Sequence, residues 1–551
     1  MNDREFNLLD EKWILVRRND CTVEEISLTN AVLRAHEYVD LAGELPTQDV
    51  SILRLMLALL HTIFSRYLPD GEKKPLERPQ DALRRWSELW HAGRFPEKPV
   101  REYLESVHER FWLFHPERPF YQTIAAKVGT EYTASKLNGA VSESSNKVRL
   151  FSGCSGRQKS EINYPEAARW LLYVNNYDDT SAKPKGKNLP SPGAGWLGKL
   201  GLITVRGNNL FETLMYNLIL LNPTDWSLWE AEKPVWELDT PRGAERTEIA
   251  APDNLSELYT LQSRRLYLVR AGEKVTGYTL LGGDFFDKVD AFIEPMTIWS
   301  AIKGSERTKT QFQPRRHDSS VQMWREFSAT FAVSDMAHIP GIVLWIEYLR
   351  KSRLIDRQRF IRFSIASVQY GDKDFFVNDL FSDSITFHTD LLTELGTRLR
   401  NMVNIEINNI DKTATAIGYL YGDIKIASGI RYSPGDSKSV QALNDLRKSA
   451  RERFYYEIDI PFREWLRNVD PNMGSLSNEE SDCFRQWHDT AKKIALKIED
   501  EFVRMAGTAA IIGRSIKTND NTAVYYSLPK ADILFKKELL NNIYPQEESN
   551  D

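Results

Sequence analysis

The spacing of hydrophobic residues changes character along the chain. Between Asp49 and Leu68 apolar side chains recur at steps of three and four residues, which predicts a buried amphipathic helix with Thr47 or Asp49 as its N-cap. Further helices are expected at 100–113, 164–174, 321–333 and 342–350. Runs rich in β-branched and aromatic residues predict strands at 202–207, 266–270, 278–283 and 360–370.

After about residue 380 the helical pattern dominates. Helical segments are expected at 385–402, at 411–430 and 437–456 as a longer pair, at 478–505 and at 529–542. Helices that are joined in this way usually pack as a bundle. The sequence therefore predicts an α+β fold with two domains, a large mixed domain over 1–382 and a C-terminal four-helix bundle over 383–551.

Composition and charge change this picture only locally. The 551 residues are 42% hydrophobic, as in an ordinary globular protein, and 72 Lys and Arg against 77 Asp and Glu give a net charge of -5. This average argues against nucleic-acid binding, which needs clustered cations. The segment 141–207 differs, because it holds ten cations and five anions in Gly-, Ser- and Pro-rich stretches, and 301–320 repeats the pattern. We expect basic loops there.

Several classes of protein are disfavoured by missing patterns. The three cysteines, Cys21, Cys154 and Cys483, are too far apart for a CxxC zinc site or a disulfide framework, which suits a reducing cytoplasm. The charged start of the chain is unlike a signal peptide, and no window approaches 18 apolar residues, so no membrane span is expected. The histidines form no metal-binding motif and no GxSxG is present. We therefore expect no metal, no cofactor and no catalysis.

Two glycine-rich strings resemble enzyme motifs without meeting their requirements. Residues Gly193 to Lys199 match GxxxxGK, but Leu200 stands where a phosphate-binding loop needs Ser or Thr, and an extended run follows instead of a helix. A nucleotide-hydrolysing enzyme remains the alternative to a flexible glycine turn. Gly282-Gly283-Asp284 resembles the GGD turn of nucleotide cyclases but lacks a second carboxylate within reach. A hairpin turn between two strands is expected there.

Four blocks of sequence resemble the CasA family, the large subunit of the type I-E CRISPR Cascade surveillance complex. They are FNLLDEKWILVRR at 6–18, FWLFHPERPFYQT at 111–123, PGAGWLGKLG at 192–201 and LQSRRLYL at 261–268. The resemblance implies a non-catalytic, cytoplasmic subunit of an antiviral defence complex. Such a subunit docks at the 5′ end of the guide RNA, recognises the PAM in double-stranded DNA through the minor groove and helps to open the duplex. Its implied partners are the guide-loaded Cascade subunits, PAM-bearing DNA and a helicase-nuclease.

The resemblance also implies site residues. Lys288, expected in a strand, corresponds to the lysine finger of the family, a donor to minor-groove acceptors; its alternative is a solvated strand lysine. The glycine loop corresponds to Gly193, Ala194 and Gly195, and the duplex wedge to the turn Gly371, Asp372, Lys373 and Asp374. The guide-docking loop corresponds to 141–151, with Asn146, Lys147, Arg149, Leu150 and Phe151.

This sequence departs from the family pattern at two of these segments, the turn at 371–374 and the docking loop. The turn at 371–374 is acidic, so the resemblance does not identify which of its residues intercalates. The identities in the docking loop also depart from the family. Some relatives bind zinc through paired cysteines, which this chain lacks, so no zinc is expected. A scaffold that binds only proteins is the second alternative function.

Overall fold

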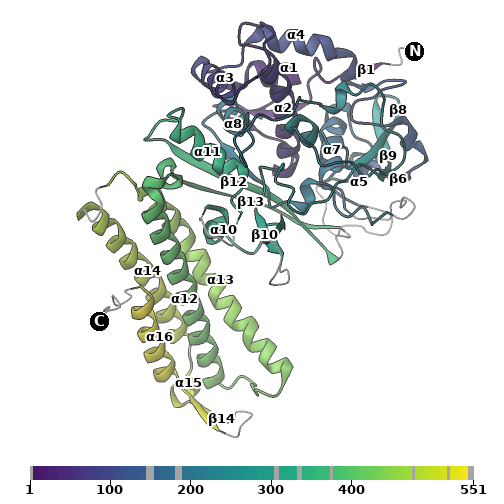
Figure 1. Cartoon of the computed structure of the whole chain (residues 1–551). Coiled ribbons are helices and arrows are strands. Elements are labelled where there is room, and N and C mark those ends of the chain that lie inside the picture. The colour runs from purple at the N-terminus through teal and green to yellow at the C-terminus, as the bar shows by residue number, and fades with distance from the viewer. Residues whose placement is uncertain are drawn as a thin grey trace. The chain divides into compact units, whose positions relative to one another are not determined.

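The computed structural model describes residues 4–143, 154–179, 189–302, 310–331, 338–372, 376–473, 478–517 and 522–543. The chain forms two compact units, Met1–Ile355 with Ile361–Ser384 and Asp356–Phe360 with Ile385–Asp551. The first unit mixes helices with small sheets, and the second is mainly helical (Figure 1). The predicted α+β class with a helical C-terminal region is confirmed.

The sheets of the first unit are small, and every strand pair whose register is described is antiparallel. The strand orders are β1-β5, β3-β2-β4, β6-β9-β8, β10-β11 and β13-β12-β7. The bounds are β1 Glu5–Asn7, β2 Ile14–Arg17, β3 Val23–Ile26, β4 Asp40–Leu41, β5 Trp112–Phe114, β6 Thr130–Thr133, β7 Ile203–Arg206, β8 Arg264–Ala271, β9 Lys274–Gly282, β10 Trp299–Ile302, β11 Gln311–Pro314, β12 Phe360–Tyr370 and β13 Val377–His388. The four predicted strands are β7, β8, β9 and β12.

The longest α-helix of the first unit, α2, packs against four of the others, α4, α7, α8 and α9. The bounds of the α-helices of this unit are α1 Leu28–Leu33, α2 Pro46–Arg66, α3 Pro79–Ala92, α4 Glu97–Val107, α5 Ala134–Leu137, α6 Arg157–Ser160, α7 Tyr164–Tyr177, α8 Leu210–Asn217, α9 Leu255–Tyr259, α10 Phe327–Phe331 and α11 Gly341–Lys351. Two predicted helices are shorter than expected. The first ends at Val107, before a 3-10 turn and β5, and the segment at 321–333 is a 3-10 turn at Met323–Glu326 followed by α10.

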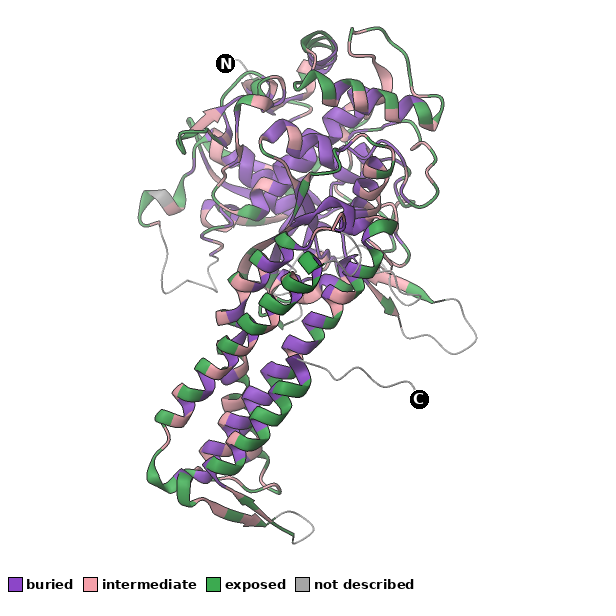
Figure 2. Ribbon diagram, turned by 90° about the vertical axis from the view of Figure 1, so that its left-hand side faces the viewer, coloured by how far each residue is buried: buried purple, intermediate pink, exposed green. Residues whose placement is uncertain are grey.

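Helix α2 is buried on nearly every side, although its spacing predicted an amphipathic helix (Figure 2). Its polar side is covered because it forms internal pairs: the guanidinium of Arg54 binds both carboxylate oxygens of Glu294 at 2.9 and 2.8 Å. Pro46 occupies its first turn and no side chain caps it, so neither predicted N-cap residue has that role. By length and composition α2 alone among the described helices could cross a membrane, but 94% of that stretch is buried inside the protein.

The second unit contains four long helices: α12 Thr397–Ala427, α13 Ser437–Asn468, α14 Asn478–Arg504 and α16 Leu528–Ile543. Helix α12 packs against the other three, and a short helix α15 Thr508–Ile512 and the hairpin of β14 Arg514–Lys517 and β15 Ala523–Tyr526 complete the unit. The predicted break between 402 and 411 is wrong. The buried side chains of Val403, Ile407 and Ile410 continue the apolar stripe across it, so one helix of 31 residues forms.

Candidate nucleic-acid interface

The glycine loop, residues 189–201, is anchored to the core of the first unit. The indole Nε1 of Trp196 donates a hydrogen bond of 2.9 Å to Oε2 of Glu294. Glu294 is also paired with Arg54 of α2, and the side chains of both residues are at most 1% exposed. Separating the two side chains of such a buried pair would leave an uncompensated charge inside the protein, which is strongly destabilising. Glu294 is therefore held in one position. The loop is therefore held in place by a buried ion pair.

The three predicted residues of this loop have different surroundings. Gly193 has a φ of 63°, the left-handed region that favours glycine, and its open side meets only the Lys199 side chain, 3.9 Å from the position of a Cβ. At Gly195 a Cβ would lie 2.3 Å from the carbonyl oxygen of Asn176, and Ala194 is 1% exposed. Only Gly193 therefore leaves room for an approaching molecule, whereas Ala194 and Gly195 serve the packing of the loop.

Arg264, at the start of β8, binds the backbone of the glycine loop. Its Nη2 donates to the carbonyl oxygen of Gly193 at 2.6 Å, and its Nε donates to Oδ2 of Asp178 at 2.6 Å. Both charged side chains are 2% exposed. The amide of Gly195 donates to the carbonyl oxygen of Asp178 at 3.0 Å, so the end of α7 and the loop share one network.

Two further arginines bind carbonyl oxygens of the same loop. Arg246 donates to the carbonyl oxygen of Pro190, and Arg316 Nε donates to that of Gly198 at 2.6 Å. The guanidinium of Arg316 also lies over the ring of Tyr370, 4.7 Å from its centroid. Together with Arg264, they bring three arginines from outside the loop to its carbonyl oxygens.

The two lysines of the site differ in exposure. Lys199 is half-buried, and burial together with the positive charges of Arg264, Arg246, Lys288 and Arg316 lowers its pKa to about 8. We call these five residues the basic cluster. Lys288 is exposed and lies in the loop after β9, so the prediction that it lies in a strand is wrong. Strand pairing ends at Gly282, and the ammonium is carried by a loop that reaches the surface.

The predicted wedge position begins beside the same loop. The hydroxyl of Tyr370, the last residue of β12, donates to the carbonyl oxygen of Tyr177 at 2.6 Å. Its oxygen would lie 2.2 Å from a Cβ on Gly198, so that glycine is required by close packing. The sheet therefore brings the β12–β13 turn to the glycine loop, about 170 residues earlier in the sequence.

The β12–β13 turn is described only in part. The amide of Gly371 donates to the carbonyl oxygen of Phe376 at 2.7 Å, which closes the hairpin, and Asp372 is exposed. Lys373 and Asp374 lie outside the described residues, as do five predicted residues of the docking loop, Asn146, Lys147, Arg149, Leu150 and Phe151. The roles of these seven residues stay predictions.

The positive charge counted along 141–207 is partly neutralised in the fold. Among the described cations of this segment, Lys159 pairs with Glu143 at 2.9 Å and Arg206 with Asp40 at 2.7 Å. Arg169 is buried and binds two carboxylates, those of Glu25 and Glu44, at 2.8 and 2.6 Å. Sequence counting therefore overstates the local charge, and of the five cations of the basic cluster only Lys199 comes from this segment.

The phosphate-loop string does not adopt the geometry of a phosphate-binding loop. Gly193 to Lys199 ends in a three-residue 3-10 turn, Leu197–Lys199, and β7 begins at Ile203, so no helix N-terminus faces the glycines. The described residues also contain no group of three or more His, Cys, Asp or Glu side chains that could hold a metal ion.

The hairpin turn predicted for Gly282-Gly283-Asp284 is wrong. The β8–β9 hairpin turns at Gly272, and after β9 the chain continues beside residues 262 and 263, with Gly283 donating to the carbonyl oxygen of Ser263 at 3.0 Å. The carboxylate of Asp284 is buried between two arginines. The aspartate is an internal ion-pair partner rather than a turn residue.

The sequence did not predict the arginines that bind the backbone of the glycine loop. Arg264 lies in the block LQSRRLYL, where two adjacent arginines in a predicted buried strand could have signalled internal ion pairs. Arg246 is in no motif, and nothing in the sequence marks it.

Sequence comparisons place this chain near known proteins. The family model described as CRISPR-associated protein Cse1 matches residues 7–498. A protein of Thermus thermophilus named CRISPR-associated protein CasA/Cse1 is 32% identical over 242 residues, which are 42% of this chain and 42% of that protein. The aligned part therefore spans less than half of that relative.

Solved structures extend the likeness over the whole chain. The crystal structure of Thermobifida fusca Cse1 matches with a TM-score of 0.81 and 26% identity, covering 98% of both chains. Cse1 from Acidimicrobium ferrooxidans matches with a TM-score of 0.78 and 23% identity, again over 98% of both chains. A chain of a CRISPR RNA-guided surveillance complex, with 16% identity and a TM-score of 0.67, has the same fold.

Proposed function

This chain belongs to the CRISPR-associated protein Cse1 family, and on this basis we propose that it is the non-catalytic large subunit of a type I-E CRISPR RNA-guided surveillance complex. In this role it binds the guide-loaded Cascade subunits and recognises the PAM in double-stranded DNA. It then helps to open the duplex and recruits the helicase-nuclease, all in the cytoplasm.

The observation that carries this proposal is the convergence of three predicted DNA-contacting segments. The loop with Gly193, the exposed Lys288 and the start of the β12–β13 turn are far apart in the sequence. Lys288 is close enough to Lys199 to affect its pKa, and Lys199 lies beside the open side of Gly193. Tyr370 connects the turn to Gly198 of the same loop.

The geometry of the basic cluster suits a minor groove. The groove is about 6 Å wide and presents only N3 and O2 acceptors at A·T pairs, so a slender donor is needed. The Lys288 ammonium is exposed and can act as a point donor, and the groove's negative potential favours its charge. Gly193 lacks a side chain on its open side, so its backbone can approach the duplex closely.

The arginines of the cluster have a supporting role in this proposal. Donor groups of Arg264, Arg246 and Arg316 are bound to carbonyl oxygens of the glycine loop. They shape the loop and add positive potential, whereas Lys288 and Lys199 are the cations that can turn to the DNA. Few atoms distinguish base pairs in the minor groove, so a tolerant PAM preference is expected.

A binding experiment tests the function directly. Guide-loaded complex with and without this subunit is mixed with target duplexes that carry a randomised PAM, and bound sequences are read out. Enrichment of particular PAM sequences that appears only with this subunit supports the proposal. Tight target binding that is indifferent to the PAM would instead favour a scaffold that binds only proteins.

The nucleotide-hydrolysing alternative is not favoured by the geometry, because the glycine string lacks a following helix. A magnesium-dependent ATP or GTP turnover assay addresses it. Sustained hydrolysis that is lost in Lys199→Ala would contradict the non-catalytic role.

A further inference from the structure

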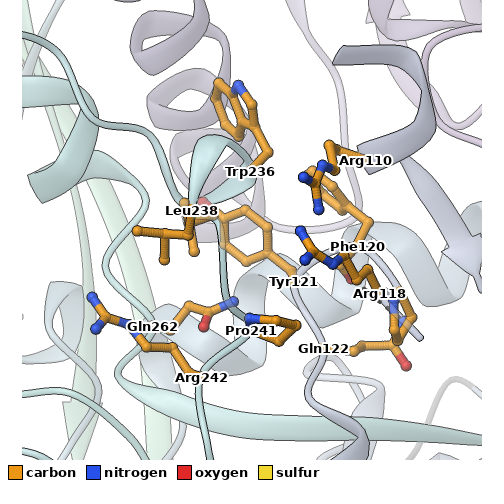
Figure 3. A pocket seen from close by; sticks show the side chains of 12 residues that line it. Arg110, Arg118, Phe120, Tyr121, Gln122, Trp236, Leu238, Pro241, Arg242 and Gln262 are labelled. Atoms are coloured by element: carbon orange, nitrogen blue, oxygen red, sulfur yellow. Dashed lines mark hydrogen bonds between the residues drawn. The ribbon is translucent and has the colours of Figure 1, made fainter.

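A pocket in the first unit gathers arginines away from the basic cluster (Figure 3). It is lined by Arg110, Arg118, Pro119, Phe120, Tyr121, Gln122, Val235, Trp236, Leu238, Pro241, Arg242 and Gln262, and none of the five residues of the basic cluster belongs to it. Figure 3 shows Arg110 and Arg118 on one side of the pocket, and Leu238 and Arg242 on the other. The pocket is therefore distinct from the basic cluster, and its positive charge comes from other arginines.

Arg110 and Arg118 have no acidic partner among the residues that the structure describes. Among the described residues no carboxylate oxygen lies within 4.0 Å of a guanidinium nitrogen of either residue. Arg118 donates from Nη2 to the carbonyl oxygen of Asp239, but its Nη1 is buried without any hydrogen-bond partner in the described part of the chain. A buried donor without a partner is costly, and a charged one especially so. An oxygen ligand in the pocket would satisfy it.

Arg242, the third arginine of the pocket, adds to the positive potential although it is itself paired with a carboxylate. Arg242 Nε lies 3.2 Å from Oδ2 of Asp284, and Arg265 Nη2 lies 2.5 Å from Oδ1 of the same carboxylate. Two guanidinium groups therefore share one carboxylate, which leaves this group with a net positive charge. The pocket accordingly has an excess of positive charge on both sides.

The backbone of the pocket is strained at one aromatic residue. Tyr121 has a φ of 54°, in the left-handed region that costs a non-glycine residue roughly 1–2 kcal/mol. Its neighbour Gln122 secures this conformation, because its Nε2 donates to the carbonyl oxygen of Leu113 at 2.7 Å and its Oε1 accepts from the amide of Leu268 at 2.8 Å. Strained residues that neighbouring contacts hold in place often lie at binding sites.

We propose that this pocket binds a phosphate group, with Arg110 and Arg118 as its ligands. In the described part of the chain these two guanidinium groups have no carboxylate partner, so they match the two negative charges of a phosphate monoester better than the single charge of a carboxylate, and their planar forks suit its oxygens. The cavity has a volume of about 60 Å³. A space of this size suits a small anion such as a phosphate group, and a nucleoside attached to that phosphate would stay outside it, beside the exposed Pro241.

Calorimetric titration of the full-length chain tests the proposal. The probes are inorganic phosphate, adenosine monophosphate and a dinucleotide with either a 5′-phosphate or a 5′-hydroxyl, at constant ionic strength. We expect saturable phosphate binding that Arg110→Gln weakens about 10- to 100-fold, the range for a hydrogen bond to a charged group. Arg17→Gln removes an exposed arginine charge outside the pocket and should leave binding unchanged.

A second variant covers the risk that a pocket substitution disturbs folding. Arg118→Lys keeps the charge but loses the planar fork, so it should also weaken phosphate binding while the thermal unfolding profile stays that of the wild type.

Tighter binding of the 5′-phosphorylated dinucleotide than of free phosphate would support a nucleic-acid end as the source. Tighter binding of free phosphate would support a free anion. No saturation up to about 10 mM phosphate, equal affinity in Arg110→Gln, or acetate binding as tight as phosphate would each overturn the proposal. The proposed PAM contacts belong to the basic cluster and not to the residues that line this pocket, so a failure of phosphate binding would leave the proposed PAM recognition standing.

Discussion

The Nη2 of Arg264 donates a hydrogen bond of 2.6 Å to the carbonyl oxygen of Gly193. Arg264 begins β8, and Gly193 is the open glycine of the loop that follows α7, so this bond joins two segments 71 residues apart. The same guanidinium is paired with Asp178 inside the protein. The proposed DNA-contacting loop is therefore positioned by a buried charge rather than by its own sequence.

Replacement of Arg264 should destabilise the first unit. Arg264→Gln breaks the buried ion pair with Asp178 by removing one of its two charges, which typically costs about 3–5 kcal/mol. Urea unfolding followed by tryptophan fluorescence measures the change. Arg17→Gln, on an exposed strand end, serves as the control with little expected effect. An unchanged unfolding midpoint in Arg264→Gln would mean that the pair does not hold the loop.

Lys288 should matter for duplex DNA and not for single strands. If it donates to a minor-groove acceptor, Lys288→Ala removes a charge-assisted hydrogen bond of about 1.5 to 3 kcal/mol, a 10- to 150-fold loss of affinity for PAM-bearing duplex. Lys288→Arg should not restore it fully, because a guanidinium is wider than an ammonium. Electrophoretic shift of the assembled complex gives the affinities.

The matched control for this test is Lys274→Ala, which removes an exposed lysine at the start of β9. A guide-complementary single strand needs no PAM and no duplex opening, so its binding should stay nearly constant. Equal weakening of both substrates by Lys288→Ala would make the lysine a general phosphate contact or a folding residue.

Binding of PAM-bearing duplex should weaken between about pH 7 and pH 9. The pKa of Lys199 is lowered to about 8, first by burial and then by the surrounding cations, so the ammonium loses its proton in this range. Below the pKa the charged form attracts DNA, and above it the attraction is lost. Lys199→Arg keeps the charge throughout, so its affinity should be flatter from pH 7 to pH 9; a profile as steep as that of the wild type would exclude Lys199 as the titrating group.

The same shift has the opposite sign for folding. Because the folded-state pKa of Lys199 lies below the ordinary value of 10.5, the unfolded chain binds more protons between these values. The contribution of Lys199 to stability therefore rises with pH from about 8 to about 10.5 and is least favourable below it. A pH titration of the unfolding midpoint in wild type and Lys199→Met separates this contribution.

The two glycines of the loop should respond differently to the same substitution. Gly195→Ala places a Cβ 2.3 Å from the carbonyl oxygen of Asn176, so the variant should be markedly less stable. Gly193→Ala meets no such contact but adds left-handed strain of roughly 1–2 kcal/mol. It should fold and bind PAM-bearing duplex more weakly. Thermal unfolding and duplex affinity together distinguish the two, and normal duplex affinity in a folded Gly193→Ala would contradict the close-approach role.

Replacement of the docking loop should separate this subunit from the guide-loaded complex. Exchanging residues 144–151 for a Gly-Ser linker of equal length retains Glu143, whose ion pair with Lys159 belongs to the described fold. Loops commonly carry binding while the core folds without them, so the variant should stay folded and fail to co-purify with the complex. Unchanged co-purification would count against the docking assignment.

Much of the local structure could be read from the sequence. The β-branched runs of β7, β8, β9 and β12 and the apolar spacing of α2, α7 and α14 reflect local preferences, which act over a few residues. The glycine string, the absence of metal motifs and the blocks typical of the family were equally visible. Element ends were less certain, as at Val107, because the competing 3-10 turn and β5 depend on tertiary contacts.

What only the tertiary structure decided is which charges are free. The sequence shows Arg169, Arg206 and Lys199 as equal cations of one basic segment. In the fold the first two are neutralised by carboxylates from the N-terminal strands and loops, whereas Lys199 is surrounded by other cations. Ion pairs between residues more than a hundred positions apart depend on the path of the whole chain. The sequence by itself therefore determined the family and the local elements, and the packing of distant segments determined the site.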